Sequence, residues 1–478
     1  MSVKISKKLA SAPSLAYTSH PDYRKPPKIA NAHLQCLGAP HIDSFNYMLQ
    51  DGLKAAIADL IPAEFELPSK ERVRIAIEEA LFSKPSVPME AVGVKNQKIL
   101  PTECRQRAAT YKGDFKIKLS LSIDGRTIEI VRSMGSLPVM VKGHERLARM
   151  LLVTRRNYPV AIKRSGWKMR GNLFSDYGIL VRCVTSDQTS TNNVLHFITN
   201  GTSKLMFSYR KTMYYAPLLL IMKCLVDWPD HHIYRLLLHG KKNDLYYVNC
   251  VQNMLRELHE EGLHSSLECR SYLGRMFRSK LFDVPPWATD LEAADFLIKR
   301  CVLIHLDNHR DKFHALVYMA QKLFDLVQNK CKVEGADAVM MQEVLVGGHL
   351  YLQVLKERLQ HLIGIMRIQV IKKAQADKRL SIGTHELQQM LRSSGNLEQK
   401  METFLATGNS PSNNVNLAQY KGLTIVAENI NRMRYMSHFK SIHRGSFFME
   451  MRTTEARQLL PDAWGFVCPV HTPDGAPC

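Results

Sequence analysis

The stretch RQLLPDAWGFVCPVHTPDGAPC, residues 457–478, carries the densest turn chemistry of the chain. Four prolines and two glycines fix or release the backbone at short intervals, which excludes a continuous helix and predicts a shaped loop. Polar side chains that could contact a charged ligand or a partner loop lie between these points: Arg457, Gln458, His471, Thr472 and Asp474. Because the chain stops inside this stretch, we expect a structural unit that is unfinished.

The composition outside this stretch indicates a soluble intracellular protein with a polyanionic partner. Its 478 residues suffice for roughly two to four domains. Lys plus Arg exceed Asp plus Glu by 65 to 44, which gives a net charge of +21. This excess favours nucleic acid or an acidic membrane surface and does not choose between them. The sequence has no apolar run of bilayer length and no secretory signal at its start.

Hydrophobic periodicity suggests where the first elements lie. Residues 1–30 show little periodicity, so a mobile tail is expected. Residues 71–82 have the apolar spacing of a helix. Residues 115–131 alternate apolar and polar side chains on both sides of Asp124-Gly125, which predicts a β-hairpin with a type I′ turn.

The later part of the chain is predicted to be mostly helical after an opening set of strands. Asn200-Gly201 predicts a hairpin turn between two of those strands. Apolar positions three and four residues apart predict helices at residues 218–228, 250–263, 293–306, 311–331, 342–374 and 386–409.

Basic side chains are concentrated first in residues 142–170, which hold nine of them and one acid, Glu145. Cations at this density repel one another unless a polyanion approaches, and Trp167 offers a ring on which a base could stack. We take four of them as candidates for nucleic-acid binding: Arg155, Arg156, Lys163 and Arg164. The alternatives are a solvated basic face and contacts with acidic loops of a neighbouring subunit.

A second basic concentration spans residues 421–457. Tyr435 and Phe439 lie among its cations, and this mixture of charges and flat rings suits a nucleic-acid channel.

The sequence contains no recognisable catalytic or metal-binding pattern. His438, His443 and Cys468 lack the tight spacing of metal ligands or of a Cys-His nucleophile, and Cys468 is expected to be packed. Phosphate-binding glycine motifs and convergent carboxylates are also missing from the sequence. We therefore expect no catalytic residue and no metal in this chain. Its ten cysteines include no C-x-x-C pair and are expected to be reduced, mostly buried thiols.

The segment WGFVCPVHTPDGAPC, residues 464–478, resembles the signature W-G-x-x-C-P-x-x-T-P-[DE]-G of the second-largest subunits of DNA-directed RNA polymerases. The histidine before TPDG is similar to the form found in RNA polymerase I, which transcribes ribosomal RNA. Other phrases of the family follow in order: HIDSFNYML (41–49), ECRQRAATY (103–111), GSLPVMVK (135–142), RRNYPVAI (155–162), FLATGN (404–409) and MRYMSHFKSIHRG (433–445). The resemblance covers nearly everything after about residue 15.

This resemblance implies an α+β multidomain fold. The family's order of domains would give a flexible tail (1–30), the first part of the protrusion (31–162), an inserted lobe (163–335), the return of the protrusion (336–410) and a partial fork (411–478). The family's active-site lysines and zinc-binding cysteines lie beyond the TPDG segment. We therefore expect the chain to be inactive alone.

The resemblance also implies a function. The chain would be a beta-type subunit in the nucleus and nucleolus that forms one wall of the DNA cleft and supports template-directed nucleotidyl transfer. Its partners would be the largest subunit, the other RNA polymerase I subunits, the DNA template and the RNA–DNA hybrid, and no membrane. It would bind no cofactor itself, while magnesium and zinc are expected in the complete enzyme. The alternatives are the second-largest subunit of another nuclear RNA polymerase, a non-catalytic nucleic-acid-binding assembly fragment, and an unrelated basic scaffold.

The family's fork adds candidate site residues, carried over position by position. Those expected to face nucleic acid or its supporting loops are Arg434, His438, Lys440, Arg444 and Arg457. Gln458 and Asp474 would support the active site. The alternatives are that Arg457 pairs with Glu455 or a neighbouring subunit, and that Asp474 closes a Pro-Asp-Gly turn.

One departure from the family lies after Lys142. Family members carry some tens of residues there, including a strand, whereas here VMVK runs directly into GHERLARML. We expect the missing strand to leave an exposed sheet edge and a poorly stable domain unless partners compensate.

Overall fold

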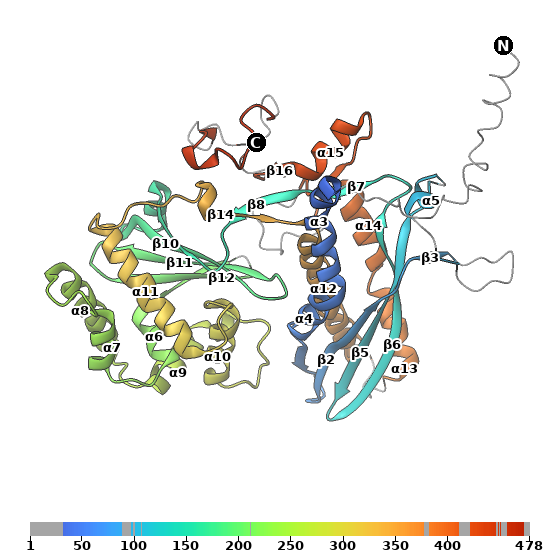
Figure 1. Cartoon of the computed structure of the whole chain (residues 1–478). Helices are drawn as coiled ribbons and strands as arrows, with labels where there is room; N and C mark the ends of the chain where they lie inside the picture. The colour runs from blue at the N-terminus through green and yellow to red at the C-terminus, as the bar shows by residue number, and fades with distance from the viewer. Residues whose placement is uncertain are drawn as a thin grey trace, which may run out of the picture.

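The computed structural model of the chain describes residues 32–87, 97–98, 101–106, 108–210, 212–376, 382–410, 421–445, 448, 450 and 457–472. Two bodies of mixed helix and sheet lie side by side in it (Figure 1). We call the first the split domain, because residues 32–148 and 347–407 contribute to one core. We call the second, residues 155–345, the inserted domain. The chain is therefore an α+β multidomain protein.

The split domain is a four-stranded antiparallel sheet covered by helices. Across the sheet the strands are β1 (Ala63–Glu66), β2 (Arg72–Phe82), β5 (Tyr111–Ile123) and β6 (Arg126–Met140). The helices are α3 (Ala32–Tyr47), a π-helical turn (Met48–Gly52), α4 (Leu53–Ala58), α12 (Gly347–Ala376), α13 (Thr384–Ser393) and α14 (Leu397–Thr407). Ile75 and Leu119 of the sheet share a buried cluster with Leu352 and Met401 of the later helices. The two halves of the sequence therefore complete a single core.

The hairpin predicted at Asp124-Gly125 is confirmed. Ile123 pairs with Arg126 across the turn, and the two turn residues have φ angles of 44° and 84°. Positive φ at both positions is what a type I′ turn requires, and this turn matches the twist of the strands it joins.

The helix predicted for residues 71–82 is wrong, because these residues form β2. Val73, Ile75 and Ile77 are buried at alternate positions, and their β-branched side chains favour a strand. Ala76 and Ala80 supplied the three-residue and four-residue spacing that resembled a helix. A shift of register after Ile77 lets the strand accommodate both patterns.

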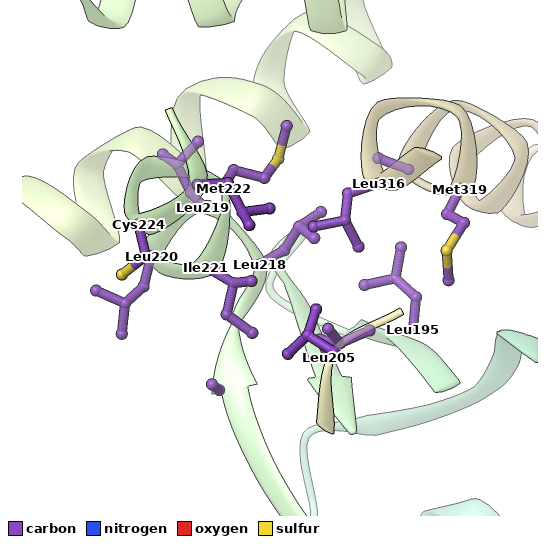
Figure 2. Packing of buried hydrophobic residues seen from close by; sticks show 14 of the residues in the cluster. Leu195, Leu205, Leu218, Leu219, Leu220, Ile221, Met222, Cys224, Leu316 and Met319 are labelled. Atoms are coloured by element: carbon purple, nitrogen blue, oxygen red, sulfur yellow. The ribbon is translucent and has the colours of Figure 1, made fainter. Parts of the chain in front are cut away.

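The inserted domain is built on a five-stranded antiparallel sheet. Across the sheet the strands are β13 (Thr212–Pro217), β12 (Ser203–Tyr209), β11 (Ser190–Ile198), β10 (Phe174–Val184) and β9 (Pro159–Lys163). Its helices are α6 (Leu218–Leu225), α7 (Asp230–Leu237), α8 (Leu245–Glu260), α9 (Ser266–Phe277), α10 (Asp290–Cys301) and α11 (His309–Val327). Figure 2 shows Leu195 and Leu205 of the sheet packed near Leu218 of α6 and Leu316 of α11. This second core is separate from that of the split domain.

The sequence predictions for the later part of the chain are largely confirmed. The turn at Asn200-Gly201 joins β11 to β12. Helices α6, α8, α10 and α11 occupy the first four predicted helical stretches, and α13 and α14 occupy the last. The helix predicted to start at residue 342 begins at Gly347, because residues 342–345 form a strand, β14 (Gln342–Leu345).

Short strands pair residues 424–426 and 442–443 with the stretch where the chain passes between the two domains. Strand β8 (Met150–Thr154) lies between β14, which is antiparallel to it, and β16 (Ile442–His443), which is parallel to it. Strand β7 (Arg146–Ala148) pairs with β15 (Thr424–Val426). Helix α15 (Arg432–Lys440) lies next to α3 (Figure 1). The remaining short elements are β3 (Ser86–Val87), β4 (Gln97–Lys98), α5 (Pro101–Gln106), η2 (Ser165–Arg170), η3 (Arg278–Lys280), η4 (Val339–Met341) and η7 (Pro461–Ala463).

The chain makes a tight turn at the departure after Lys142. Lys142 and Gly143 have φ angles of 49° and 73°. Strand β6, which ends just before this turn, is the last strand of its sheet. Glu398 of α14 accepts a hydrogen bond from the backbone N–H of Ser136 at 3.1 Å, so a helix side chain caps part of that edge. The expected loss of stability stays a prediction.

Candidate nucleic-acid interface

The structure brings the two basic concentrations of the sequence into contact. Pairing of β7 with β15 and of β8 with β16 lays residues 424–443 against residues 146–151. His41 of α3 lies within hydrogen-bond distance of the Phe439 carbonyl, with its Nε2 3.1 Å away, which holds α15 against the split domain. Arg155 and Arg156, which follow β8, and Arg444, which follows β16, therefore lie near the place where β8, β14 and β16 meet.

Arg155 and Arg156 lie directly after β8, at the entrance to the inserted domain. Arg155 is exposed, and its guanidinium lies 4.9 Å from the centre of the Tyr158 ring. Arg156 is half-buried and donates from Nε to Glu343 of β14 at 2.9 Å. Arg155 can therefore reach a ligand directly, while Arg156 is held by a carboxylate.

Glu343 joins Arg156 to Arg182, a cation of β10 that the sequence analysis did not single out. Arg182 donates to Glu343 at 2.6 Å and is only 7% exposed in its side chain. Burial alone would raise the pKa of Glu343, but the bonds and charges of the two arginines bring it below its usual value. Burial lowers the pKa of Arg182. This triad fixes the strand that returns to the split domain, so its role in the structure is positional.

Lys163 and Arg164 extend the group along the end of β9, and both are exposed. The Lys163 ammonium lies 5.2 Å from the centre of the Tyr177 ring. Trp167, which was expected to offer a stacking face, is only 5% exposed, and its ring packs edge-on against His196 at 4.6 Å. That expectation is wrong, because the indole completes a small apolar cluster on the sheet.

Helix α15 presents the second group. Asn431 caps the helix by accepting a hydrogen bond from the N–H of Arg434 at 2.7 Å. Arg434 donates in turn to Glu428 at 3.0 Å across a half-exposed pair. Lys440, at the end of the helix, is exposed. Of the two candidate cations on this helix, Lys440 is exposed and Arg434 is paired with a carboxylate.

The two histidines of this region are held neutral by their surroundings. His438 is 5% exposed; burial and then the charge of Arg434 lower its pKa. Burial and the charge of Arg149 likewise lower the pKa of His443. A buried, uncharged imidazole has little attraction for a phosphate, so the placement of His438 favours a supporting role.

The remaining candidates lie between β16 and η7. Arg444 pairs with Asp337 at 2.7 Å and stacks 4.2 Å from the centre of the Phe448 ring. Arg457 donates to the carbonyl of Phe448 at 3.4 Å. Gln458 is exposed. Asp474 and Glu455 lie outside the described residues.

The described cysteines mostly follow the expectation. Six of nine are buried and none of the nine forms a disulfide. Cys468 is an exception to the predicted packing, because it is exposed on the loop after η7, where its sulfur accepts a hydrogen bond from the N–H of His471 at 3.3 Å. That bond and a second from Val470 lower the pKa of its thiol.

Neither a metal site nor a membrane span is found within the described part of the chain. No group of three or more His, Cys, Asp or Glu side chains in the described ranges is placed to hold a metal ion. Among the same residues, no helix combines the length and apolar character needed to cross a membrane.

Comparison with known proteins gives consistent matches along the chain. Three family profiles match in order: RNA polymerase beta subunit at residues 36–150, RNA polymerase Rpb2 domain 2 at residues 155–345 and RNA polymerase Rpb2 domain 3 at residues 425–478. DNA-directed RNA polymerase I subunit RPA2 of Drosophila melanogaster is 43% identical over 493 residues, covering 96% of this chain and 44% of the relative.

Other relatives agree. Subunit RPA2 of Mus musculus is 39% identical over 98% of this chain, and subunit RPA135 of Saccharomyces cerevisiae is 35% identical over 95% of it. The matched regions are 44% and 43% of those relatives, so the chain spans less than half the length of the curated relatives it matches.

Proposed function

Because the chain belongs to the family of RNA polymerase second-largest subunits, of the RNA polymerase I type, we propose that it forms one wall of a DNA cleft and supports templated RNA synthesis. The observation that carries this proposal is the junction of the two basic concentrations through β7–β15 and β8–β16. These pairings bring the cations that follow β8 near the one that follows β16, although they are far apart in sequence, and contact with one continuous phosphate backbone requires such proximity.

We further propose how the parts of the chain correspond to the family's domains. The split domain would be the protrusion, the inserted domain the lobe, and residues 411–478 the partial fork. The proposed partners are the largest subunit and the other polymerase subunits, a DNA template and an RNA–DNA hybrid. The proposed location is the nucleus, and within it the nucleolus. The active-site support proposed for Gln458 and Asp474 rests on the family signature alone.

The candidate residues divide into two roles by exposure and pairing. Arg155, Lys163, Arg164 and Lys440 are exposed and would contact phosphate directly. Residues with the second role would hold this surface in shape, because carboxylates, carbonyls or burial already fix them: Arg156, Arg434, His438, Arg444 and Arg457. The family implies magnesium and zinc for a complete enzyme, and no group of three or more His, Cys, Asp or Glu side chains among the described residues is placed to hold a metal ion.

The salt dependence of DNA binding tests this division of roles. The variant Lys163→Ala/Arg164→Ala removes two exposed cations, and Lys242→Ala/Lys372→Ala removes two exposed cations elsewhere. The slope of log Kobs against log salt should fall by roughly 1 for each phosphate that the first variant no longer binds, and it should not change in the second. Equal slopes for both variants and the parent would refute direct phosphate binding by these two residues.

Purification of the complex that contains the chain tests the larger proposal. Co-elution with a largest polymerase subunit and templated RNA synthesis would support a polymerase subunit. DNA binding by the chain without those partners or that activity would instead support a nucleic-acid-binding assembly protein.

A further inference from the structure

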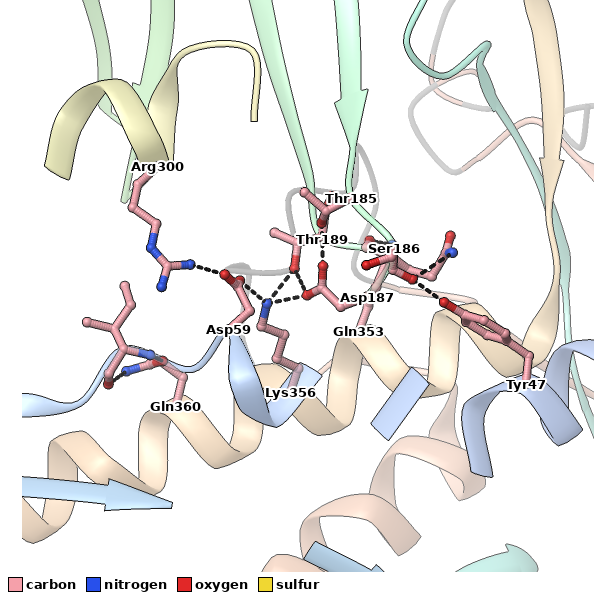
Figure 3. Close-up of polar contacts among 12 residues, drawn as sticks. Tyr47, Asp59, Thr185, Ser186, Asp187, Thr189, Arg300, Gln353, Lys356 and Gln360 are labelled. Carbon is pink, nitrogen blue, oxygen red and sulfur yellow. Dashed lines mark hydrogen bonds and ion pairs between the residues drawn. The ribbon is translucent and has the colours of Figure 1, made fainter. Parts of the chain in front are cut away.

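Polar side chains join the two domains where the inserted domain meets α12. The large apolar clusters of the split and inserted domains share no residue within the described ranges. Polar contacts join the domains along one side of α12, where the tip of the β10–β11 hairpin meets the helix (Figure 3). Away from α12, the Arg72 guanidinium of β2 lies 4.9 Å from the centre of the Trp287 ring of the inserted domain. Polar contacts can separate without exposing an apolar core to water, so this joint differs in kind from the packing within each domain.

The hairpin tip is shaped to present a carboxylate. The N–H of Thr185 donates to the carbonyl of Thr189 at 3.1 Å, and Gln188 takes a positive φ of 67° to close the turn. The hydroxyls of Thr185 and Thr189 both donate to the carboxylate of Asp187, whose side chain is 4% exposed. The inserted domain therefore holds this negative charge in place through its own turn.

Lys356 of α12 joins that carboxylate to the split domain. Its ammonium pairs with Asp187 and donates to the Thr189 hydroxyl at 2.6 Å. The same ammonium pairs with Asp59, just after α4, at 2.5 Å. Its side chain is 14% exposed, so these bonds are largely shielded from water. One cation thus binds a carboxylate from each domain.

Arg300 of α10 extends the network from the inserted domain. It pairs with Asp59, so charges alternate from Arg300 to Asp59, Lys356 and Asp187 (Figure 3). Burial alone would raise the pKa of Asp187, but the charge and hydrogen bond of Lys356 and the two hydroxyls bring it below its usual value. The network therefore pairs two acidic side chains with two basic ones, in alternation.

Contacts on either side of this network are also polar. Gln353, one turn before Lys356 on α12, donates to the carbonyl of Gln188 at 2.6 Å. The hydroxyl of Tyr47 donates to the carbonyl of Ser186. They place the hairpin tip in one register along α12.

We infer that Lys356 is a latch residue that sets the orientation of the inserted domain on the split domain. Release of its bonds to Asp187, Thr189 and Asp59 would let the inserted domain turn as a rigid body on the strands that connect it, with both cores intact. The inference that this orientation sets the width of a DNA cleft rests on the proposed function; the latch itself does not.

Hydrogen exchange of the full chain, measured without nucleic acid, tests the latch. We compare Lys356→Met with Lys372→Met, a matched change of an exposed lysine on the same helix. Peptides that cover residues 184–190 should exchange about tenfold faster in Lys356→Met, because the hairpin tip is released, while peptides of α11 and β5 keep their protection. Lys372→Met should match the parent throughout.

A second variant keeps the test decisive. Asp187→Asn keeps one oxygen that can accept a hydroxyl hydrogen bond but removes the charge that Lys356 binds, and it should give the same local signature. Unchanged exchange at residues 184–190, or equal acceleration of the α11 and β5 peptides, would overturn the inference. Loss of the folded state in both variants would overturn it too, because a latch between two independently packed cores is dispensable for folding. A negative DNA-binding result would leave these outcomes unaffected.

Discussion

Two glycines of α12 should respond in opposite directions to the same substitution. Gly348 lies where α12 crosses α3, and an added Cβ would lie 2.3 Å from the backbone C and O atoms of Ser44 and 2.5 Å from the N atom of Phe45. Gly364 lies further along the same helix with nothing within 4 Å of an added Cβ. Alanine therefore meets main chain at the first position and open space at the second.

The magnitudes follow from these distances. Alanine at position 364 should stabilise the helix by about 0.5–1 kcal/mol, because alanine loses less backbone entropy than glycine. At position 348 the two helices must separate by about an ångström to reach ordinary contact, and overpacking of this kind costs about 1–3 kcal/mol. Separation would also weaken the 3.1 Å hydrogen bond from the Gly348 N–H to the Ser44 hydroxyl, which contributes about 1 kcal/mol. We expect the two variants to differ by about 2–4 kcal/mol.

Urea unfolding followed by two probes measures this difference. Three of the four tryptophans, Trp167, Trp228 and Trp287, lie in the inserted domain, so their fluorescence reports that domain. Exchange of α12 amides reports the split domain. Gly348→Ala should lower the split-domain midpoint and Gly364→Ala should raise it, with little change in fluorescence. Equal midpoints for the two variants would refute the close approach of α12 to α3.

Three further predictions concern ionisable groups. Burial, and then the charge of Arg170, lower the pKa of His196 to about 3, so below pH 6.5 the unfolded chain takes up a proton before the folded chain does. The free energy of unfolding should therefore fall by about 1.4 kcal/mol for each pH unit below that value. In acid titrations followed by tryptophan fluorescence, His196→Gln should reduce this slope. Burial lowers the pKa of Lys312 to about 8, so the unfolded chain keeps its proton to higher pH and the inserted domain should gain stability between about pH 8 and 10.5. In thermal melts, Lys312→Met should abolish that gain. A melting temperature of the parent chain that does not change over this pH range would contradict the lowered pKa of Lys312. Glu343→Gln leaves Arg182 buried without its carboxylate and should lower the free energy of unfolding in urea by about 2–3 kcal/mol. The double variant Arg182→Met/Glu343→Leu should recover much of that loss. If Glu343→Gln leaves the free energy of unfolding unchanged, the triad does not stabilise this part of the fold.

Local turn chemistry made the hairpins predictable, and long-range pairing could not be read in the same way. Asp124-Gly125 specifies its own positive φ angles, so a few residues decide the turn. In β2 the apolar residues satisfied both periods, and pairing with β5 decided between them. The pairing of β14 with β8 joins segments that are far apart in the sequence, and the residues of neither strand identify the other as its partner. Only the family resemblance implied that the two halves of the split domain rejoin.

In the candidate site, too, the sequence could not identify long-range partners, because a count of basic residues does not show which of them are paired with carboxylates. Arg156 is held by Glu343 and Arg444 by Asp337, and both acids lie at the end of the inserted domain, where the chain returns to the split domain. That stretch is distant from both basic concentrations in the sequence, so the sequence count treated these arginines as available charges.

Pairing also changes what DNA binding can measure. A cation that already holds a carboxylate gains less from a phosphate, because the bond to the carboxylate must first be given up. The exposed side chains of Arg155, Lys163, Arg164 and Lys440 need no such exchange with a carboxylate seen in this structure. The number of counterions released on DNA binding should therefore follow the exposed cations and fall well short of the number of basic residues in the two concentrations. A salt slope that matched the number of all basic residues in the two concentrations would mean that ion pairs such as Arg156–Glu343 and Arg444–Asp337 open when DNA binds.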